Sequence, residues 1–519
     1  MAKTDVVVKN AQIVSSAGSY RGSIIVEKDR IAGIAVSGDL PKAERVIDAE
    51  GRFVIPGVVD PHTHIGGKYL LEQDFRTETP AAAAGGVTTV GVMHGAGRAD
   101  RNYKEFVTEA DARPWSERFP VAREIGEEAS MVDFFYTPYI SMDEQCDDIP
   151  KAARTFGIPS WKFYANLREP KTANVAPKWK YRMGMPGEFD DGLFWLGFEH
   201  IGKFGPAGIA LIHNENTEVA TAVMKRLQKE GRTDGPAWTD RCPPWCEAEH
   251  IYRYGLFSMK AGCRFYILHL STADGLEACD EMRKRGCRIV VETCPQYLIM
   301  TKNDAPRVGN EPNARALKVN PPIRDKHHNE ALWKGVQDGR IQCMGTDHVV
   351  TSIHEKFVRG DTGDRTTDPR KDVWSTGSGF VGLDTLLPHM LSEGVHKGRV
   401  SLERVVEICC ENPARTFGLY PKKGTLTVGA DADLVILDMD KEVTFTADHL
   451  HSYADFTIFD GRRIKGWPWL TMCRGKVVFE GNQVCGEHGH GRYLPRKLDR
   501  LMFPLDESWD MPKKGFGKR

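Results

Sequence analysis

The chain has 519 residues, a formal net charge of −1 and an ordinary globular composition, with 41% hydrophobic and 27% charged residues. This length exceeds a typical single domain but fits one large α/β domain with a smaller companion. The near-neutral charge balance gives no reason to expect nucleic acid or an anionic membrane as a partner.

The first residues lack the apolar segment of a signal peptide, and no uncharged apolar run is long enough to predict a transmembrane helix. The 12 cysteines are scattered, without a Cys-x-x-Cys pair. Cys242 and Cys246 have a spacing that a zinc knuckle could use, but no matching second pair follows, so free thiols are favoured. We therefore expect a cytoplasmic protein.

Residues 5–55 contain short strand-like runs separated by Gly, Asn and Asp. The same sequence pattern recurs at 432–437 and 471–479. Each piece is too short to bury a core alone. We therefore expect one β-sandwich domain built from both termini, residues 1–55 plus 416–485, rather than two separate β modules.

Residues 56–415 alternate short apolar runs with amphipathic stretches, such as the candidate helices Asn216–Glu230 and Ala273–Gly286. Repeated β-then-α units imply a parallel sheet, and this length favours a closed (β/α)8 TIM-type barrel. A doubly wound open sheet is the alternative. It is less favoured because no Gly-x-Gly-x-x-Gly follows an early strand and no P-loop motif occurs.

Three further segments do not fit the alternation of strands and helices. The stretches Arg168–Glu188 and Gly231–Cys246 look like insertions, and inserted loops of a barrel tend to shape the substrate mouth. The tail, residues 486–519, is basic and lacks periodicity. It is either a solvated end or an arm that lies on a neighbouring subunit.

The most informative stretch is Asp60-Pro61-His62-Thr63-His64, which directly follows an apolar run suited to a buried strand. Residues two apart on a strand share a face, so His62 and His64 can aim both imidazoles at one divalent metal. An isolated His-x-His is more often a coincidence, so the rest of the chain has to support the metal hypothesis.

Polar residues end several other apolar runs of the middle region. Residues at the carboxyl ends of barrel strands converge on one mouth, where catalysis resides. A lone histidine or aspartate at such a place is usually a core, loop or capping residue. Several such residues in strand order instead favour one shared metal site formed by His62, His64, Lys162, His213, His269 and Asp347.

Lys162 lies between aromatic neighbours, so desolvation should lower the pKa of its amine. A neutral amine can react with CO2 to give a carbamate, an oxygen-donor anion that could bridge two metals. The alternative is a snorkelling or ion-paired lysine.

Motifs along nearly the whole chain carry a family resemblance. They include Ile55–His64, Ser160-Trp-Lys162, Glu292–Leu298, Gly345-Thr-Asp-His348 and Asn412–Pro421. Through them the chain resembles the amidohydrolase superfamily, and within it the dihydropyrimidinase/hydantoinase group of cyclic amidohydrolases.

This resemblance implies a barrel with a β-sandwich and two divalent metal ions, usually zinc. His62, His64 and Asp347 would hold the more buried ion, and His213 and His269 the more exposed one. N6-carboxylated Lys162 and a hydroxide would bridge the two. Family members are commonly tetramers whose C-terminal tail helps assembly, which favours a homo-oligomer (dimer or tetramer) and the arm interpretation of the tail.

The implied reaction is hydrolysis of an amide C–N bond in a small cyclic amide, imide or ureide. The bridging hydroxide would attack, and Asp347 would pass its proton to the departing nitrogen. Two alternatives stay open: a mononuclear amidohydrolase that acts on a linear amide or as a deaminase, and a non-catalytic scaffold relative.

The positions that contact substrate depart from typical hydantoinases. Leu167 stands where those enzymes carry a tyrosine, and Tyr164 is nearby but would face the other way if both lay on one strand. Asn320 replaces a serine, and the expected asparagine is replaced within a loop that includes Gly377 and Ser378. Tyr164, Asn320, Gly377 and Ser378 are the tentative substrate contacts.

Aromatic residues cluster around these positions and could mark a larger or aromatic substrate, although ordinary core packing is favoured. They are Trp161, Phe163, Tyr164, Trp179, Tyr181, Phe194 and Trp195.

Overall fold

The computed structural model describes residues 4–93, 113–167, 189–309, 311–359 and 372–496. The predicted insertion Arg168–Glu188, with Trp179 and Tyr181, lies outside the described residues, as does the tail beyond residue 496. In the described part of the chain, no helix is long and apolar enough to cross a membrane.

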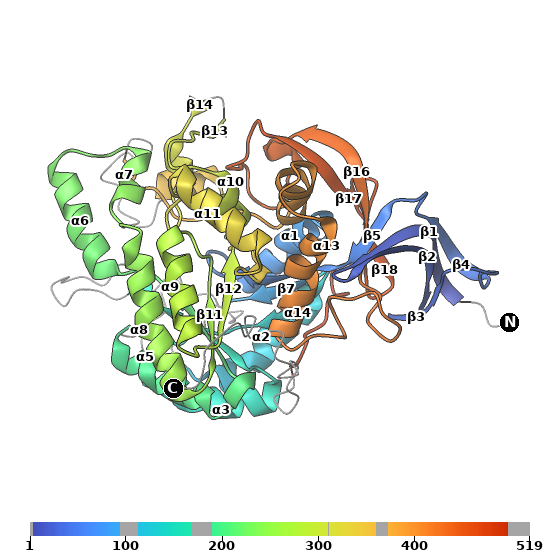
Figure 1. Ribbon diagram of the computed structural model, residues 1–519, viewed down its shortest axis with the longest axis horizontal. Coiled ribbons are helices and arrows are strands. Elements are labelled where there is room, and N and C mark those ends of the chain that lie inside the picture. Colours follow the sequence, from blue (N-terminus) through green and yellow to red (C-terminus); the bar gives the residue numbers. More distant parts are fainter. Residues whose placement is uncertain (1–3, 94–112, 168–188, 310, 360–371, 497–519) are drawn as a thin grey trace.

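Strands from both ends of the chain form one nine-stranded sheet, at the right of Figure 1. The N-terminal strands are β1 (Thr4–Ser15), β2 (Gly18–Glu27), β3 (Arg30–Ala35), β4 (Ala43–Asp48) and β5 (Phe53–Pro56). The C-terminal strands are β16 (Leu434–Thr444), β17 (Arg463–Cys473), β18 (Lys476–Glu480) and β19 (Gln483–Val484). The strand order is β19-β18-β17-β16-β5-β1-β2-β3, and β4 pairs with β1.

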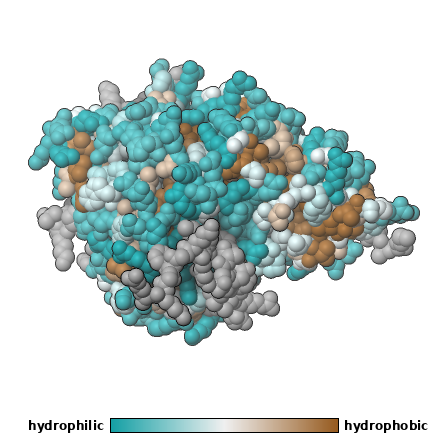
Figure 2. Space-filling view, in the orientation of Figure 1, coloured by the Kyte–Doolittle hydropathy of each residue, from teal (hydrophilic) through white to brown (hydrophobic). Residues whose placement is uncertain are grey.

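Residues from the two ends share one apolar cluster, in which Val8, Ile13, Leu434 and Leu470 are all buried. Strands β5 and β16 pair antiparallel, so they join the N-terminal half of this sheet to the C-terminal half. Neither end could bury these side chains without the other, as the sequence predicts. Figure 2 shows hydrophobic colour gathered on this right-hand end of the molecule, where Val36 and Val46 are among the exposed hydrophobic residues.

The described residues of the middle of the chain contribute eight parallel strands in two sheets. One sheet has the order β6-β7-β8 and the other β15-β12-β11-β10-β9. The strands are β6 (Val58–Thr63), β7 (Val87–Val92), β8 (Asp133–Tyr136), β9 (Ser160–Tyr164), β10 (Ile209–His213), β11 (Arg264–Ile267), β12 (Ile289–Thr293) and β15 (Cys343–Met344).

The two parallel sheets are hydrogen bonded to each other at both of their edges. At one edge the His64 amide donates to the His348 carbonyl at 2.8 Å, just beyond β6 and β15. At the other edge the Lys162 amide donates to the Pro138 carbonyl at 2.8 Å, between β9 and the segment after β8. The carboxyl ends of all eight strands therefore face one side of the molecule.

Helices follow most of these strands and pack around them (Figure 1). They are α1 (Leu71–Ala84), α2 (Trp115–Ala129), α3 (Asp143–Phe156), α5 (Asp191–Gly202), α6 (Thr217–Lys229), α7 (Gly235–Asp240), α8 (Trp245–Ala261), α9 (Ala273–Lys284), α10 (Pro295–Ile299), α11 (Lys326–Gln337), α12 (Leu386–His389), α13 (Leu402–Val406) and α14 (Asn412–Thr416). The predicted helices at 216–230 and 273–286 are α6 and α9. Their N-termini are capped by the side chains of Asn216 and Thr272.

The first part of the tail packs on its own chain. The Arg492 carbonyl accepts from the Phe134 amide at 3.0 Å, and Arg496, with 1% of its surface exposed, donates to Ser160 Oγ at 2.6 Å. Residues 486–496 are therefore attached beside β8 and β9 rather than forming a solvated end.

Candidate metal centre

Polar side chains meet where the parallel strands end. His62 and His64 come from the end of β6, Lys162 from β9 and His213 from the last position of β10. His269 follows β11, and Asp347 follows β15. Each of these residues is at most 8% exposed, so the structure brings all the predicted ligands into one buried region.

Four donor atoms lie within a few ångströms of one another. His62 Nε2 is 3.3 Å from His64 Nε2 and 3.2 Å from Asp347 Oδ1, and His64 Nε2 is 3.0 Å from the same oxygen. Lys162 Nζ lies 3.3 Å from His62 Nε2 and 3.4 Å from His64 Nε2. Ligands about 2.0–2.1 Å from a tetrahedral zinc are about 3.3–3.4 Å apart, so this spacing fits one ion.

The two remaining histidines complete a second group beside the first. The rings of His213 and His269 have centroids 4.4 Å apart, and those of His62 and His269 are 5.2 Å apart. His269 Nδ1 is buried and has no hydrogen-bond partner in the described part of the chain. A buried imidazole nitrogen without a partner is unfavourable unless it binds something, so His213 and His269 fit a second metal.

Carboxylates outside the predicted set hold the imidazoles in place. Glu292 Oε1 lies 2.7 Å from His62 Nδ1, and Tyr266 donates to Glu292 Oε2 at 2.8 Å. Glu215 Oε2 lies 3.1 Å from His213 Nε2. Metal-binding histidines typically donate their second ring N–H to such groups. Glu292 has the same signal as the predicted residues, a polar side chain at the end of an apolar strand, yet sequence reasoning gave it no role.

Electrostatics favour neutral imidazoles at His64, His213 and His269, whereas at His62 burial is outweighed by Glu292 and Asp347, which raise the pKa of its imidazole. Burial lowers the pKa of His64 to about 3, and burial also lowers the pKa values of His213 and His269, so these imidazoles carry free lone pairs at neutral pH. Burial lowers the pKa of Lys162 to about 7, with Asp347 and Glu292 partly opposing the change. Burial disfavours the Asp347 carboxylate, but the facing histidines hold its pKa well below the usual value.

Two site residues have unusual backbone conformations. His269 has φ = 37° and Asp347 has φ = 53°, in the left-handed region that residues other than glycine rarely adopt. Such conformations persist only where the surrounding structure enforces them, and they concentrate at functional sites. This observation is independent of the donor distances.

The structure corrects one expectation about Tyr164. Leu167 lies in a short turn, Ala165–Leu167, beyond the end of β9, so strand alternation does not relate the two positions. Tyr164 is two residues after Lys162 and shares its face. Its hydroxyl lies 3.4 Å from His64 Nδ1, and its ring centre lies 4.3 Å from Lys162 Nζ. Tyr164 therefore points into the centre.

The other tentative substrate contacts lie on segments that are hydrogen bonded to two lysines, the buried Lys356 and the partly buried Lys68. Lys356 Nζ donates to the carbonyls of Lys318 and Gly379 at 3.0 and 2.8 Å, which joins the segment before Asn320 to the loop of Gly377 and Ser378. Lys68 Nζ donates to the Ser378 carbonyl at 2.8 Å. Asn320 accepts from Arg241 at 2.8 Å, and Arg241 also contacts Glu215 at 3.1 Å.

Other candidate sites are less well supported. Trp161, Phe163 and Phe194 are fully buried in the main apolar cluster, as expected for core packing. Cys242 and Cys246 are buried free thiols, and the groupings of possible metal ligands among the described residues do not include them.

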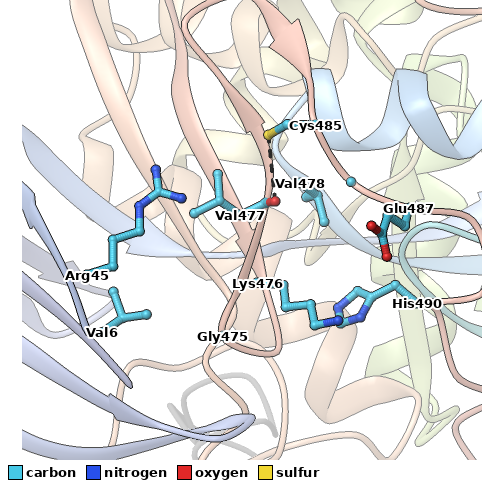
Figure 3. Close-up of a pocket in the computed structure, with 10 residues that line it drawn as sticks. Val6, Arg45, Gly475, Lys476, Val477, Val478, Cys485, Glu487 and His490 are labelled. Atoms are coloured by element: carbon cyan, nitrogen blue, oxygen red, sulfur yellow. Dashed lines mark hydrogen bonds between the residues drawn. The ribbon is translucent and has the colours of Figure 1, made fainter. Parts of the chain in front are cut away.

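A pocket of about 310 Å³ lies away from the strand ends, between β4, β18 and the segment after β19. Figure 3 shows Arg45 on one side of it and Lys476, Glu487 and His490 on the other. It contains none of the predicted site residues.

Comparison with known proteins shows what this chain is similar to. Residues 45–118 and 267–478 match two family models, each described as "Amidohydrolase family". The chain is 35% identical to an L-hydantoinase of Paenarthrobacter aurescens, over 95% of this chain and 98% of that protein. It is 30% identical to a D-hydantoinase of Geobacillus stearothermophilus, over 96% and 98%.

Solved structures give the same result. The crystal structure of a D-hydantoinase superposes with a TM-score of 0.80 at 28% identity, over 95% of this chain and 99% of that chain. The L-hydantoinase (dihydropyrimidinase) from Arthrobacter aurescens superposes with a TM-score of 0.80 at 33% identity, over 95% and 100%.

Parallel strands that end in a buried cluster of histidines, a lysine and an aspartate define a metal-dependent hydrolase of the amidohydrolase type. The full-length matches show that the chain belongs to the amidohydrolase family, as a hydantoinase-like member. The resemblance read from the sequence motifs is confirmed.

Proposed function

We propose that this protein is a binuclear metal-dependent hydrolase that opens a small cyclic amide, imide or ureide by cleaving its C–N bond. The observation that carries the proposal is that two donor groups adjoin: the atoms of His62, His64 and Asp347 lie 3.0–3.3 Å apart, and the ring of His269, paired with His213, lies 5.2 Å from the His62 ring. The matching hydantoinases support this substrate class. A mononuclear enzyme, a deaminase or a scaffold is not favoured by these matches.

The proposed architecture supports this function. We propose that the eight parallel strands close into a (β/α)8 barrel spanning residues 56–415, since their two sheets are bonded at both edges. Residues 1–55 plus 416–485 would form the β-sandwich. The carboxyl ends of barrel strands are where this fold places its active sites.

The donor set suits two divalent ions, for which zinc is our proposal. His62, His64 and Asp347 would hold one ion and His213 and His269 the other, with an N6-carboxylated Lys162 between them. The lowered pKa of Lys162 supports the carbamate, because only the neutral amine reacts with CO2. When bound, such ions supply Lewis acidity, which lowers the pKa of water and polarises an amide carbonyl.

Asp347 is the proposed catalytic acid–base residue. Its low pKa keeps the carboxylate ionised at neutral pH, so it can accept the proton of the attacking water. It then delivers that proton to the departing nitrogen, because an amide anion is too poor a leaving group to depart unprotonated.

Tyr164 is proposed to take over the role of the tyrosine missing at Leu167. Burial raises the pKa of Tyr164 well above the usual value, so its hydroxyl stays protonated and can donate. A hydrogen-bond donor near the reacting carbonyl stabilises the oxyanion that develops there. Asn320, Gly377 and Ser378 are the further proposed substrate contacts.

We also propose that the protein is a cytoplasmic homo-oligomer. Its cysteines are free thiols, eleven of them buried, as is typical of reducing compartments. Leu196 on α5 and Leu256 and Met259 on α8 are large hydrophobic residues with 38%, 46% and 37% of their surface exposed. Burying them against a second copy would remove apolar area from water.

The proposed function is tested by incubating the metal-loaded protein with hydantoins, dihydropyrimidines, cyclic imides, lactams and linear amides. Ring opening of a hydantoin, dihydropyrimidine or imide that is lost on chelation and restored by zinc is the expected result. Turnover of linear amides alone, or of no compound while the metal is bound, would contradict the proposal.

A further inference from the structure

The connection between β16 and β17, residues 445–462, leaves the terminal sheet and lies against the parallel-strand region. The Tyr453 amide donates to Glu78 Oε1 on α1 at 3.1 Å, and Ser452 Oγ donates to Glu78 Oε2. Asp455 Oδ1 accepts from the Ile353 amide at 2.6 Å, in the segment after β15. The connection is therefore hydrogen bonded to two segments of the parallel-strand region.

Glu78 is a buried carboxylate that also faces a histidine. Its Oε2 lies 3.0 Å from Nε2 of His348, and both residues are 0% exposed. His348 directly follows Asp347, a proposed metal ligand. A buried carboxylate is unfavourable unless polar partners satisfy it. Here those partners come from the β16–β17 connection on one side and from His348 on the other.

Hydrogen bonds fix the orientation of the His348 ring. Its Nδ1 accepts from the backbone amides of Gly382 and Leu383, at 3.1 and 3.3 Å. An imidazole nitrogen that accepts carries no proton, so the ring proton is on Nε2, the atom that faces Glu78. The ring therefore has one arrangement that suits all of these groups, and Glu78 is part of it.

The backbone of His348 is held as well as its ring. Its amide donates to Thr346 Oγ1 at 3.1 Å, and its carbonyl accepts from the His64 amide at 2.8 Å. Thr346 is itself fixed, because its hydroxyl donates to Asp60 Oδ2 at 2.6 Å. Asp347 lies between these two anchored residues, and its Oδ1 is 3.0 Å from His64 Nε2. The placement of both donor atoms thus depends on His348.

We propose that Glu78 and His348 are positioning residues of the metal centre, and that Ser452 and Tyr453 hold Glu78 for this purpose. The pair acts through Asp347 and His64, whose donor atoms it keeps at the spacing that a metal ion needs. A displacement of about 1 Å in such a site can cost about 100-fold in rate. This inference rests on the proposed function and adds to it a role for the terminal sheet.

The test measures zinc affinity by competition with a chelator, alongside kcat and KM of the zinc-saturated enzyme on the best ring substrate. Glu78→Ala should weaken zinc binding about 10–100-fold, the usual cost of losing a group that orients metal ligands. At saturating zinc, kcat should fall by about 100-fold with KM little changed, because Asp347 is displaced. Glu78→Gln keeps an oxygen for His348 and should recover most of both losses.

His348→Asn is a second variant, which keeps the test open if Glu78→Ala fails to fold. Its side-chain oxygen can still accept from the Gly382 amide, while the group that faces Glu78 is gone, so the same losses are expected. Because the two residues act as one unit, the double variant should lose no more zinc affinity than Glu78→Ala alone. Asp455→Ala is the matched control, since it removes a hydrogen bond of the same connection to Ile353 and should leave zinc affinity and kcat unchanged.

Unchanged zinc affinity and kcat in both Glu78→Ala and His348→Asn would overturn the inference. Equal losses in Glu78→Ala and Asp455→Ala would also overturn it, because the connection would then only stabilise the fold. The zinc measurements need no substrate. The expected order of zinc affinities, together with no ring opening by the wild type, would therefore overturn only the proposed hydrolysis.

Discussion

Two buried clusters at opposite ends of the parallel strands each bring together three possible metal ligands. The groupings among the described residues are His62, His64 and Asp347 at the carboxyl ends, and Asp133, Asp433 and Cys473 at the other end. Asp133 is the first residue of β8, whereas His62 and His64 lie at the end of β6. Both clusters are buried and include a carboxylate, so burial alone does not distinguish them.

The two clusters differ in the cations that compensate their carboxylates. Lys423 Nζ lies 2.6 Å from Asp133 Oδ2 and 2.7 Å from Asp433 Oδ2, and Arg474 Nε lies 2.9 Å from Asp133 Oδ1. Burial disfavours the charge of Lys423, but the two carboxylates raise its pKa well above the usual value. This cluster is an ion-pair network that joins β8 to the terminal sheet.

Lys162, at the carboxyl ends of the strands, shows a pKa shift in the opposite direction to that of Lys423. Burial lowers the pKa of Lys162, and burial also lowers the pKa values of His64, His213 and His269. His269 Nδ1 has no hydrogen-bond partner in the described part of the chain, whereas the carboxylates of the other cluster face buried cations. Carboxylates paired with buried cations indicate a structural role, and a buried donor atom without a partner indicates a ligand site.

The largest effect should follow removal of Lys162. Lys162→Ala takes away the proposed carbamate between the two metals, and we expect hydrolysis to fall by at least about 1,000-fold, because metal stabilisation of charge is worth several kcal/mol. Steady-state rates on the best ring substrate measure the loss. A variant with near-normal activity and one metal per chain would support the mononuclear alternative.

Removing Lys423 from the ion-pair network at the other end of the strands should lower the free energy of unfolding rather than the rate of hydrolysis. Lys423→Met leaves buried carboxylates without their cation, which typically costs about 3–5 kcal/mol. Urea unfolding measures the change, and the folded variant should keep its metal content. Lys422→Met is the matched control, because Lys422 is 47% exposed and lies 3.8 Å from its carboxylate partner. Equal losses in the two variants would contradict a structural role for Lys423.

Glu292→Gln should weaken metal binding without abolishing it. The carboxylate that orients His62 is lost while the ligands stay, and such changes typically cost about 10–100-fold in metal affinity. Competition with a chelator measures the affinity. Unchanged affinity would show that His62 needs no partner to keep its orientation.

The carboxyl-end region also contains the ion pair of Glu215 and Arg241. We expect this pair to give a smaller, pH-dependent effect on the stability of the fold. Burial opposes ionisation of Glu215, but Arg241 lowers the pKa of its carboxyl to about 2, from an ordinary value of 4.5. Because the folded protein favours the ionised Glu215, this carboxylate contributes stability above pH 4.5, and the contribution is lost as the pH falls toward 2.

In metal-free protein, the difference in unfolding temperature between the wild type and Glu215→Gln should therefore narrow as the pH is lowered from neutral to acid. Thermal scans across this range measure it. A constant difference would indicate that Glu215 acts only through packing.

Part of this arrangement could be predicted from the sequence. Strand alternation brings His62 and His64 to one face, and the rule that strand ends converge adds His213, His269 and Asp347. These are local patterns, so short windows of sequence reveal them.

Contacts between distant segments could not be predicted in this way. Asp133 and Lys423 are 290 residues apart, and no periodicity links them. The direction of Tyr164 relative to Leu167 could not be predicted, because the strand ends before Leu167 and strand ends are set by tertiary pairing. Glu292 followed the strand-end rule, but its role depends on which imidazole it meets.

The metal content of the purified chain tests the central claim most directly. The account predicts two divalent ions per chain in the wild type, an unchanged number in Lys423→Met and a lower number in Lys162→Ala. Zinc-reconstituted wild type with fewer than two ions per chain, or ions retained in full by Lys162→Ala, would contradict it.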